Sequence, residues 1–166
     1  MKKYAAMLIA LLVSAFIYLF YRTSQTVINQ IFTIFFGDDF YLMIKSELQS
    51  NLKLPSQIIY SLPGALWVWV ISIASRDVFI LFKGKKISLV FLPLVVAISF
   101  EFFQHIHWIN GHFDWWDIIY AFIFWVLSFW SFNKQKRSFH DVNSTVHYKL
   151  IFLGSYLLVF FAHVMG

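Results

Sequence analysis

The chain has 166 residues, of which 60% are apolar, 22% are aromatic and only 13% are charged. A soluble globular domain carries about 25% charged residues. This composition, with a mean hydropathy of +0.71, therefore makes a water-soluble globule implausible and predicts one integral membrane domain over residues 1–166. The absence of cysteine excludes disulfides, thiolate zinc sites and thiol catalysis. The net charge of +5 comes from basic residues at the ends of apolar runs, which indicates lipid headgroups rather than nucleic acid as partners.

Five apolar segments are long enough, or nearly so, to cross a bilayer as helices. A hydrocarbon core about 30 Å thick needs roughly 20 helical residues. The predicted fold class is therefore all-α, a polytopic membrane bundle of about five transmembrane helices at residues 4–21, 57–75, 87–106, 117–132 and 149–165. The first segment follows Lys2 and Lys3 as a signal peptide would, but its apolar run continues to Tyr21. This length favours a retained anchor.

Residues 27–50 separate the first two predicted spans and contain the apolar run IFTIFF, which is too short to cross a membrane. We expect an interfacial helical segment here, broken at Gly37 and Asp38–Asp39, with a re-entrant hairpin as the alternative. Within the second span, Pro63 predicts a kink and Gly64 predicts the close approach of a neighbouring helix.

The distribution of lysine and arginine predicts the orientation of the chain. The N-terminus and the connections at 76–86 and 133–148 are basic, whereas the connection at 22–56 is neutral and residues 107–116 contain no basic side chain. Basic connections remain on the cytoplasmic side of bacterial membranes. The N-terminus is therefore expected in the cytoplasm, and the C-terminus and residues 107–116 are expected outside.

Polar side chains are concentrated at residues 98–120, at the junction of the third and fourth predicted spans. Glu101 lies inside the third span, where a carboxyl group must be paired, hydrogen-bonded, protonated or exposed to water. Gln104, His105 and Trp108 follow it at helical spacing. We expect all four to share one face, directed into the bundle.

Asp114 and Asp117 stand at the start of the fourth predicted span. Asp114 suits the N-cap position, and Asp117 then occupies the third helical position, where an acid complements the helix dipole. Alternatively, one or both carboxylates turn toward Glu101 and His105 across the short loop. The two roles are compatible, since one oxygen can cap the helix while the other binds.

Three of the six histidines, His105, His107 and His112, fall within eight residues. The HxH spacing places two rings on different faces of a helix, and a metal site needs three or four converging groups. We therefore expect no metal and no cofactor, and we interpret these histidines as hydrogen-bonding groups. The neighbouring aromatic residues fit an outer interfacial belt, or else a groove for a lipid or isoprenoid: Trp108, Phe113, Trp115 and Trp116.

Glu101 and Gln104, followed by a short loop and the run GHFDWWD at residues 111–117, resemble the VanZ-like family of small bacterial integral membrane proteins. The resemblance covers residues 98–130. His112 departs from the pattern, since the family usually has arginine there, and the helix that follows lacks the asparagine and glycine that the family favours. The resemblance implies a bacterial inner-membrane protein with a functional site at its outer face, without naming a reaction.

Three functions remain open. The first is a non-enzymatic membrane protein that binds a lipidic or glycopeptide-like molecule, or a membrane protein partner, at its outer face. The binding residues would be Glu101, Gln104, His105, Trp108, His112, Asp114 and Asp117. The second is an intramembrane enzyme acting on a lipid-linked substrate, with Glu101 or Asp117 as general acid or base and His105 or His112 as its partner. The third is a subunit of a transporter or channel.

Overall fold

The structure is a computed structural model that describes residues 2–22, 27–76, 78–82, 85–109, 111–131 and 140–141. Within these ranges the chain is mostly helical. The helices are α1 (Lys2–Phe20), α2 (Val27–Phe36), α3 (Asp38–Asn51), α4 (Ser56–Ser75), η1 (Leu89–Phe91, a 3₁₀ helix), α5 (Leu92–His105) and α6 (Trp115–Trp130). The strands are β1 (Val78–Phe82), β2 (Lys85–Ser88) and β3 (His140–Asp141). The predicted span at 149–165 lies outside the described residues.

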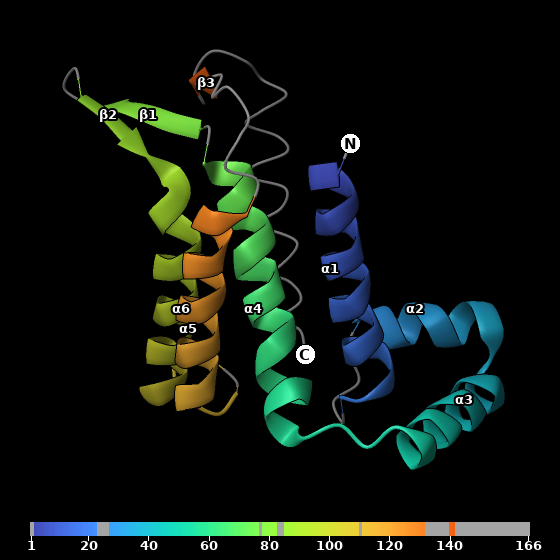
Figure 1. Cartoon of the computed structure of the whole chain (residues 1–166). Helices are drawn as coiled ribbons and strands as arrows, with labels where there is room; N and C mark the ends of the chain where they lie inside the picture. The colour runs from blue at the N-terminus through green and yellow to red at the C-terminus, as the bar shows by residue number, and fades with distance from the viewer. Residues whose placement is uncertain are drawn as a thin grey trace.

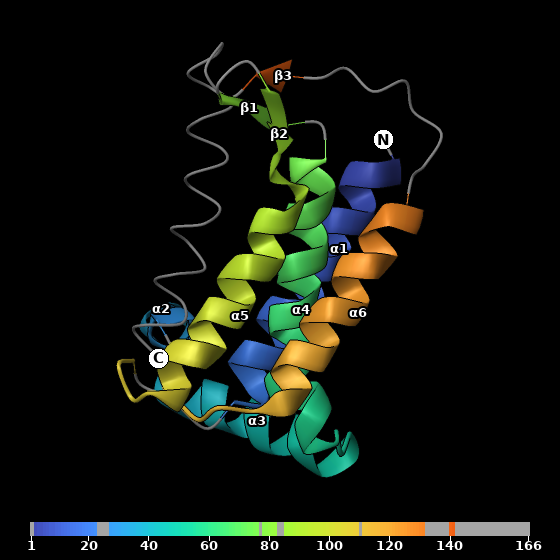
Figure 2. The same ribbon diagram turned by 90° about the vertical axis from the view of Figure 1, so that its left-hand side faces the viewer.

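Four helices, α1, α4, α5 and α6, run side by side (Figures 1 and 2). The middle helix, α4, contacts α1 on one side and both α5 and α6 on the other. Among the described residues, α1 and α4 are long and apolar enough to cross a membrane, with 19 and 20 residues. The segments η1–α5 and α6 are apolar but shorter. All four lie within a few residues of the predicted spans, because long apolar runs mark helices reliably.

The two ends of the bundle carry different connections (Figure 1). One end holds the N-terminus and the β1–β2 hairpin, which are rich in lysine. The other end, called here the loop end, holds the α5–α6 loop together with α2 and α3. Connections predicted to share one side of a membrane therefore share one end of the molecule.

The segment between α1 and α4 forms two helices that break at Gly37, as predicted. Gly37 has φ +84°, a backbone conformation that glycine adopts without steric cost, and Asp38 and Asp39 then occupy the first turn of α3. Helix α2 lies across the loop end of α1 (Figure 1) and exposes large apolar side chains, including Ile34 and Phe35. The interfacial placement of this segment stays a prediction.

Side chains of α3 satisfy the carbonyl groups at the end of α1, which have no partner within their own helix. Tyr41 Oη donates to Leu19 O at 2.8 Å, and Gln49 Nε2 donates to Phe20 O at 2.8 Å. Lys45 Nζ donates to the carbonyl oxygen of the following residue, Arg22, at 3.0 Å. These hydrogen bonds fix α3 against the end of α1.

The strands correct the all-α prediction for residues 76–88. Residues 76–86 are predicted as a plain connection and 87–106 as a span, but β1 pairs antiparallel with β2 and parallel with β3. Helical structure therefore begins at Leu89 instead of residue 87. The reason lies in the β1 sequence VFILF, whose branched and aromatic side chains favour a strand.

Candidate functional site

Glu101 and Gln104 hold the α5–α6 loop against the end of α5. Glu101 is 4% exposed, and its Oε2 accepts a hydrogen bond from the backbone N–H of Asp114 at 3.1 Å. Gln104 is also buried; with its amide nitrogen turned toward the neighbouring acceptors, it donates to Glu101 Oε1 and to His112 O, each at 3.3 Å. Both oxygens of the Glu101 carboxyl group therefore have partners.

Gly111 is the loop residue against which the Gln104 side chain packs. Its φ is +132°, a region that side-chain-bearing residues rarely adopt. A Cβ atom at this position would lie 2.4 Å from a terminal atom of the Gln104 amide group. The side chains of Glu101 and Gln104 and the backbone at Gly111 therefore form one structural unit that closes the loop.

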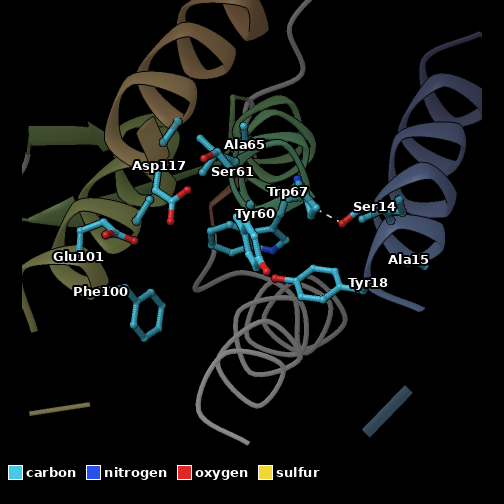
Figure 3. A pocket seen from close by; sticks show the side chains of 16 residues that line it. Ser14, Ala15, Tyr18, Tyr60, Ser61, Ala65, Trp67, Phe100, Glu101 and Asp117 are labelled. Atoms are coloured by element: carbon cyan, nitrogen blue, oxygen red, sulfur yellow. Dashed lines mark hydrogen bonds between the residues drawn. The ribbon is translucent and has the colours of Figure 1, made fainter. Parts of the chain in front are cut away.

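The two aspartates at the start of α6 have different environments. Asp114 is the N-cap, and its Oδ1 accepts from the backbone N–H of Trp116 at 2.9 Å, which confirms the predicted cap. Asp117 is half-buried, and its carboxyl group points toward that of Glu101 (Figure 3). The predicted meeting of Glu101 with the start of α6 is thus present, through the Asp114 backbone and the Asp117 side chain.

The histidines and Trp108 lie away from the carboxyl groups. His105, His107 and His112 are exposed, and the His105 ring packs edge-on against Phe113, with centroids 5.1 Å apart. Trp108 is 75% exposed and stacks on a phenylalanine of α5 at 5.6 Å. Trp108 does not continue the helical face that was expected to carry Glu101, Gln104 and His105, because α5 ends at His105 and the chain then changes direction.

His107 has a structural role in this change of direction. Its φ is +60°; its N–H donates to Gln104 O at 3.0 Å, and the next N–H, of Trp108, donates to Phe103 O at 2.9 Å. This hydrogen-bond pattern is a Schellman motif, in which glycine is the preferred residue at the position of His107.

Replacement of His107 by glycine should therefore stabilise the protein by about 1 kcal/mol, because glycine adopts this conformation without steric strain. Thermal unfolding in detergent measures the effect. The matched control is His105→Gly, which places glycine inside α5 and should destabilise the protein by about 1 kcal/mol. Equal destabilisation by both variants would contradict the structural role.

A cavity of about 290 Å³ lies between α1, α4, α5 and α6, and Glu101 and Asp117 stand at its polar end. Its walls are otherwise mainly apolar. The lining residues from α1 are Leu11, Ser14, Ala15 and Tyr18; those from α4 are Tyr60, Ser61, Pro63, Gly64, Ala65, Trp67 and Val68; those from α5 and α6 are Ala97, Phe100, Glu101, Asp117 and Ala121.

Small residues keep this cavity open. Among the described residues, a Cβ atom at Gly64 would meet nothing within 4 Å, so Gly64 leaves free space on the cavity side of α4. The close approach of a neighbouring helix at Gly64 stays a prediction. The adjacent Pro63 lies inside α4 without ending it, and its carbonyl oxygen accepts from Ser14 Oγ at 3.3 Å. The kink expected at Pro63 stays a prediction.

The contributions of α1 and α4 to the site were not predicted from the sequence. Ser61, 2% exposed, lies next to Asp117, and the hydroxyl ends of Tyr18 and Tyr60, which both line the cavity, point toward one another (Figure 3). Arg22 lies over the Tyr18 ring, with Cζ 4.5 Å from the ring centroid. The sequence did contain one indication that Arg22 has a role. Arg22 follows the first predicted span at its outer end, and lysine and arginine are less frequent in connections on the outer side of a membrane.

Among the described residues, no group of three or more histidine, aspartate or glutamate side chains could hold a metal ion. The site therefore consists of carboxyl, hydroxyl and guanidinium groups at the end of an apolar cavity. Comparisons of the chain with protein-family models, with curated proteins and with solved structures find no match.

Proposed function

We propose that this chain is a multi-pass integral membrane protein that binds an amphiphilic molecule in the cavity beside α4. The observation that carries the proposal is the cavity itself, whose apolar walls end at the carboxyl groups of Glu101 and Asp117. Ligand sites combine apolar walls with a few placed polar groups. An amphiphile fits this arrangement, with its apolar part against the walls and its headgroup at the carboxyl end.

Apolar exposure supports the membrane location. Helix α1 exposes Leu8, Ile9 and Leu12, and the other helices of the bundle also expose large apolar side chains, including Val95 on α5 and Phe122 on α6. Monomeric soluble proteins rarely expose apolar surface on this scale. In a bilayer the same side chains contact lipid, and the helices satisfy their own backbone groups.

The proposed arrangement has five spans, with the segment at 149–165 as the fifth. The N-terminus and the lysine-rich hairpin face the cytoplasm, and the loop end, with the polar end of the cavity, faces the outer leaflet. The resemblance of Glu101, Gln104 and residues 111–117 to the VanZ-like pattern supports placement in a bacterial inner membrane.

An enzyme acting on a lipid-linked substrate is the second candidate. The observation that favours it is the pair of facing carboxyl groups, Glu101 and Asp117, which could exchange a proton with a bound substrate. It has weaker support than binding, because the expected partners His105 and His112 are exposed outside the cavity. Purified protein that converts no lipid-linked ester or phosphate would rule it out.

The proposal predicts that filling the cavity removes the ligand. Gly64→Leu places a side chain in open space without a backbone clash, and overfilling an apolar site should reduce occupancy by an amphiphile about tenfold or more. Native mass spectrometry of protein extracted in mild detergent measures the bound fraction. The matched control, Gly64→Ala, adds one methyl group and should keep the ligand.

Thermal unfolding of the Gly64→Leu protein shows whether the bundle is intact. If this folded variant retains as much amphiphile as the unmodified chain, the ligand does not occupy the cavity and the proposed function is wrong. If the unmodified chain carries no amphiphile and takes none up from mixed vesicles, the proposal is also wrong.

A further inference from the structure

Three buried polar atoms at or beside the polar end of the cavity make no hydrogen bond of good geometry among the described residues. They are Oδ1 of Asp117, Oγ of Ser61 and, next to the cavity, Nε of Arg22. Ser61 and Arg22 are both close enough to the Asp117 carboxyl group to interact with it. Buried polar atoms in folded proteins almost always have a partner, and an unmade hydrogen bond is costly. Their grouping beside one cavity indicates a ligand whose headgroup completes them.

The three atoms need different kinds of hydrogen-bonding partner in the headgroup of the ligand. Asp117 Oδ1 can only accept a hydrogen bond when the carboxyl group is ionised, and Ser61 Oγ can also accept. Arg22 Nε can only donate. A headgroup that satisfies all three must therefore carry a hydrogen-bond donor on the side of Asp117 and an acceptor on the side of Arg22.

The position of Arg22 suits an anionic group beside the cavity. Its guanidinium is held over Tyr18 and lies 5.7 Å from the Tyr60 ring, and Nη2 donates to Tyr60 O at 3.3 Å. Lys45 adds a second positive charge near the Arg22 backbone, and its Nζ contacts the neutral oxygens Arg22 O and Tyr41 Oη. Arginine presents several N–H groups in a geometry that matches a phosphate.

The opposite side of the polar end suits a cation. Glu101 and Asp117 place two carboxyl groups together, and Asp117 is also close enough to Arg22 for their charges to interact. Glu101 already has partners for both oxygens, so Asp117 and Ser61 are the groups left for the ligand. A primary ammonium supplies three N–H donors, whereas a quaternary ammonium supplies none.

On the basis of the proposed function, we infer that the cavity selects a zwitterionic lipid whose headgroup carries a primary ammonium next to a phosphate. The ammonium donates to Asp117 Oδ1 and Ser61 Oγ, and the phosphate accepts from Arg22 Nε. A phosphatidylethanolamine headgroup has this chemistry. Phosphatidylcholine lacks the N–H donors, and phosphatidylglycerol lacks the positive charge.

The test is lipid competition on the full chain. Purified protein is incubated with vesicles containing equal amounts of phosphatidylethanolamine, phosphatidylcholine and phosphatidylglycerol with matched acyl chains, and retained lipid is identified by native mass spectrometry. We expect phosphatidylethanolamine to be retained about tenfold more than either other lipid. Phosphatidylcholine has no N–H donor for Asp117 Oδ1 and Ser61 Oγ. Phosphatidylglycerol has hydroxyl donors but no positive charge to place beside the two carboxyl groups.

Two variants and one control test which residues determine the preference for phosphatidylethanolamine. Asp117→Asn removes the charge, keeps one acceptor oxygen and should weaken the preference for phosphatidylethanolamine over phosphatidylglycerol, whereas Asp39→Asn, at an exposed position on α3, should leave it unchanged. Arg22→Gln should lower retention of every phosphate-bearing lipid tested. Unaltered selectivity in Asp117→Asn would overturn the inference.

The remaining outcomes separate this inference from the proposed function. Equal retention of the three lipids, lost in Gly64→Leu, overturns the headgroup inference and leaves amphiphile binding in place. A preference for phosphatidylethanolamine that persists in Gly64→Leu places the lipid outside the cavity and overturns both. Retention of no lipid also overturns both, and an experimental map with only water at Asp117 and Ser61 overturns the headgroup inference.

Discussion

Replacing Glu101 with alanine is expected to lower the free energy of unfolding by about 3 kcal/mol. The variant leaves the backbone N–H of Asp114 without its acceptor and removes the acceptor that Gln104 contacts. Glu101 is 4% exposed, so water cannot readily replace the carboxyl oxygens. Denaturant titration in detergent micelles, followed by circular dichroism, measures the change.

Two further variants test the reason for this loss. Glu101→Gln keeps one oxygen that can accept from Asp114 N–H, so it should lose only about half as much stability. Glu47→Ala removes an exposed carboxyl group on α3 and should change stability by no more than about 0.5 kcal/mol. If Glu101→Ala is as stable as Glu47→Ala, Glu101 does not hold the loop.

Gly111→Ala is expected to destabilise the protein by about 3 kcal/mol. The alanine must adopt φ +132°, and its Cβ must displace the Gln104 amide group, a terminal atom of which would otherwise lie 2.4 Å away. Because Gln104 contacts Glu101 and His112, its displacement also opens the loop. The same denaturant titration gives the loss of stability.

Gly37 provides a matched control for the backbone effect. It has φ +84°, but a Cβ atom there would meet no atom of the described residues within 4 Å, so Gly37→Ala should cost only the conformational strain, about 1–2 kcal/mol. Combining Gly111→Ala with Gln104→Ala removes the clash and should cost less than the sum of the two single variants. Strict additivity would show that Gln104 does not pack against Gly111.

The main helices could be predicted from the sequence because each is a continuous apolar run. The predicted spans 4–21, 57–75 and 117–132 correspond to α1, α4 and α6 with small shifts at their ends. The β1–β2 hairpin could not be predicted on the same basis, because a five-residue apolar run between charges also fits a loop. Its strand character depends on pairing with β2 and β3.

The candidate site was predictable only where its residues are close in sequence. Glu101, Gln104, Asp114 and Asp117 lie within one helix–loop–helix, so spacing and capping rules could bring them together. Tyr18 and Ser61 reach the cavity, and Arg22 lies beside Tyr18, through the packing of α1 on α4, which sequence spacing does not encode. Helical spacing also assigned Trp108 to the site, because it could not show that α5 ends at His105.

The hydrogen bonds from α3 to the end of α1 have a consequence for the synthesis of the protein. Helix α1 is made first, and the carbonyl groups of Leu19 and Phe20 then have no permanent partner. Tyr41 and Gln49, which provide those partners, are added 20 to 30 residues later. Residues 2–51 are therefore expected to fold together, and the end of α1 is completed only after α3 has been made and has packed against it.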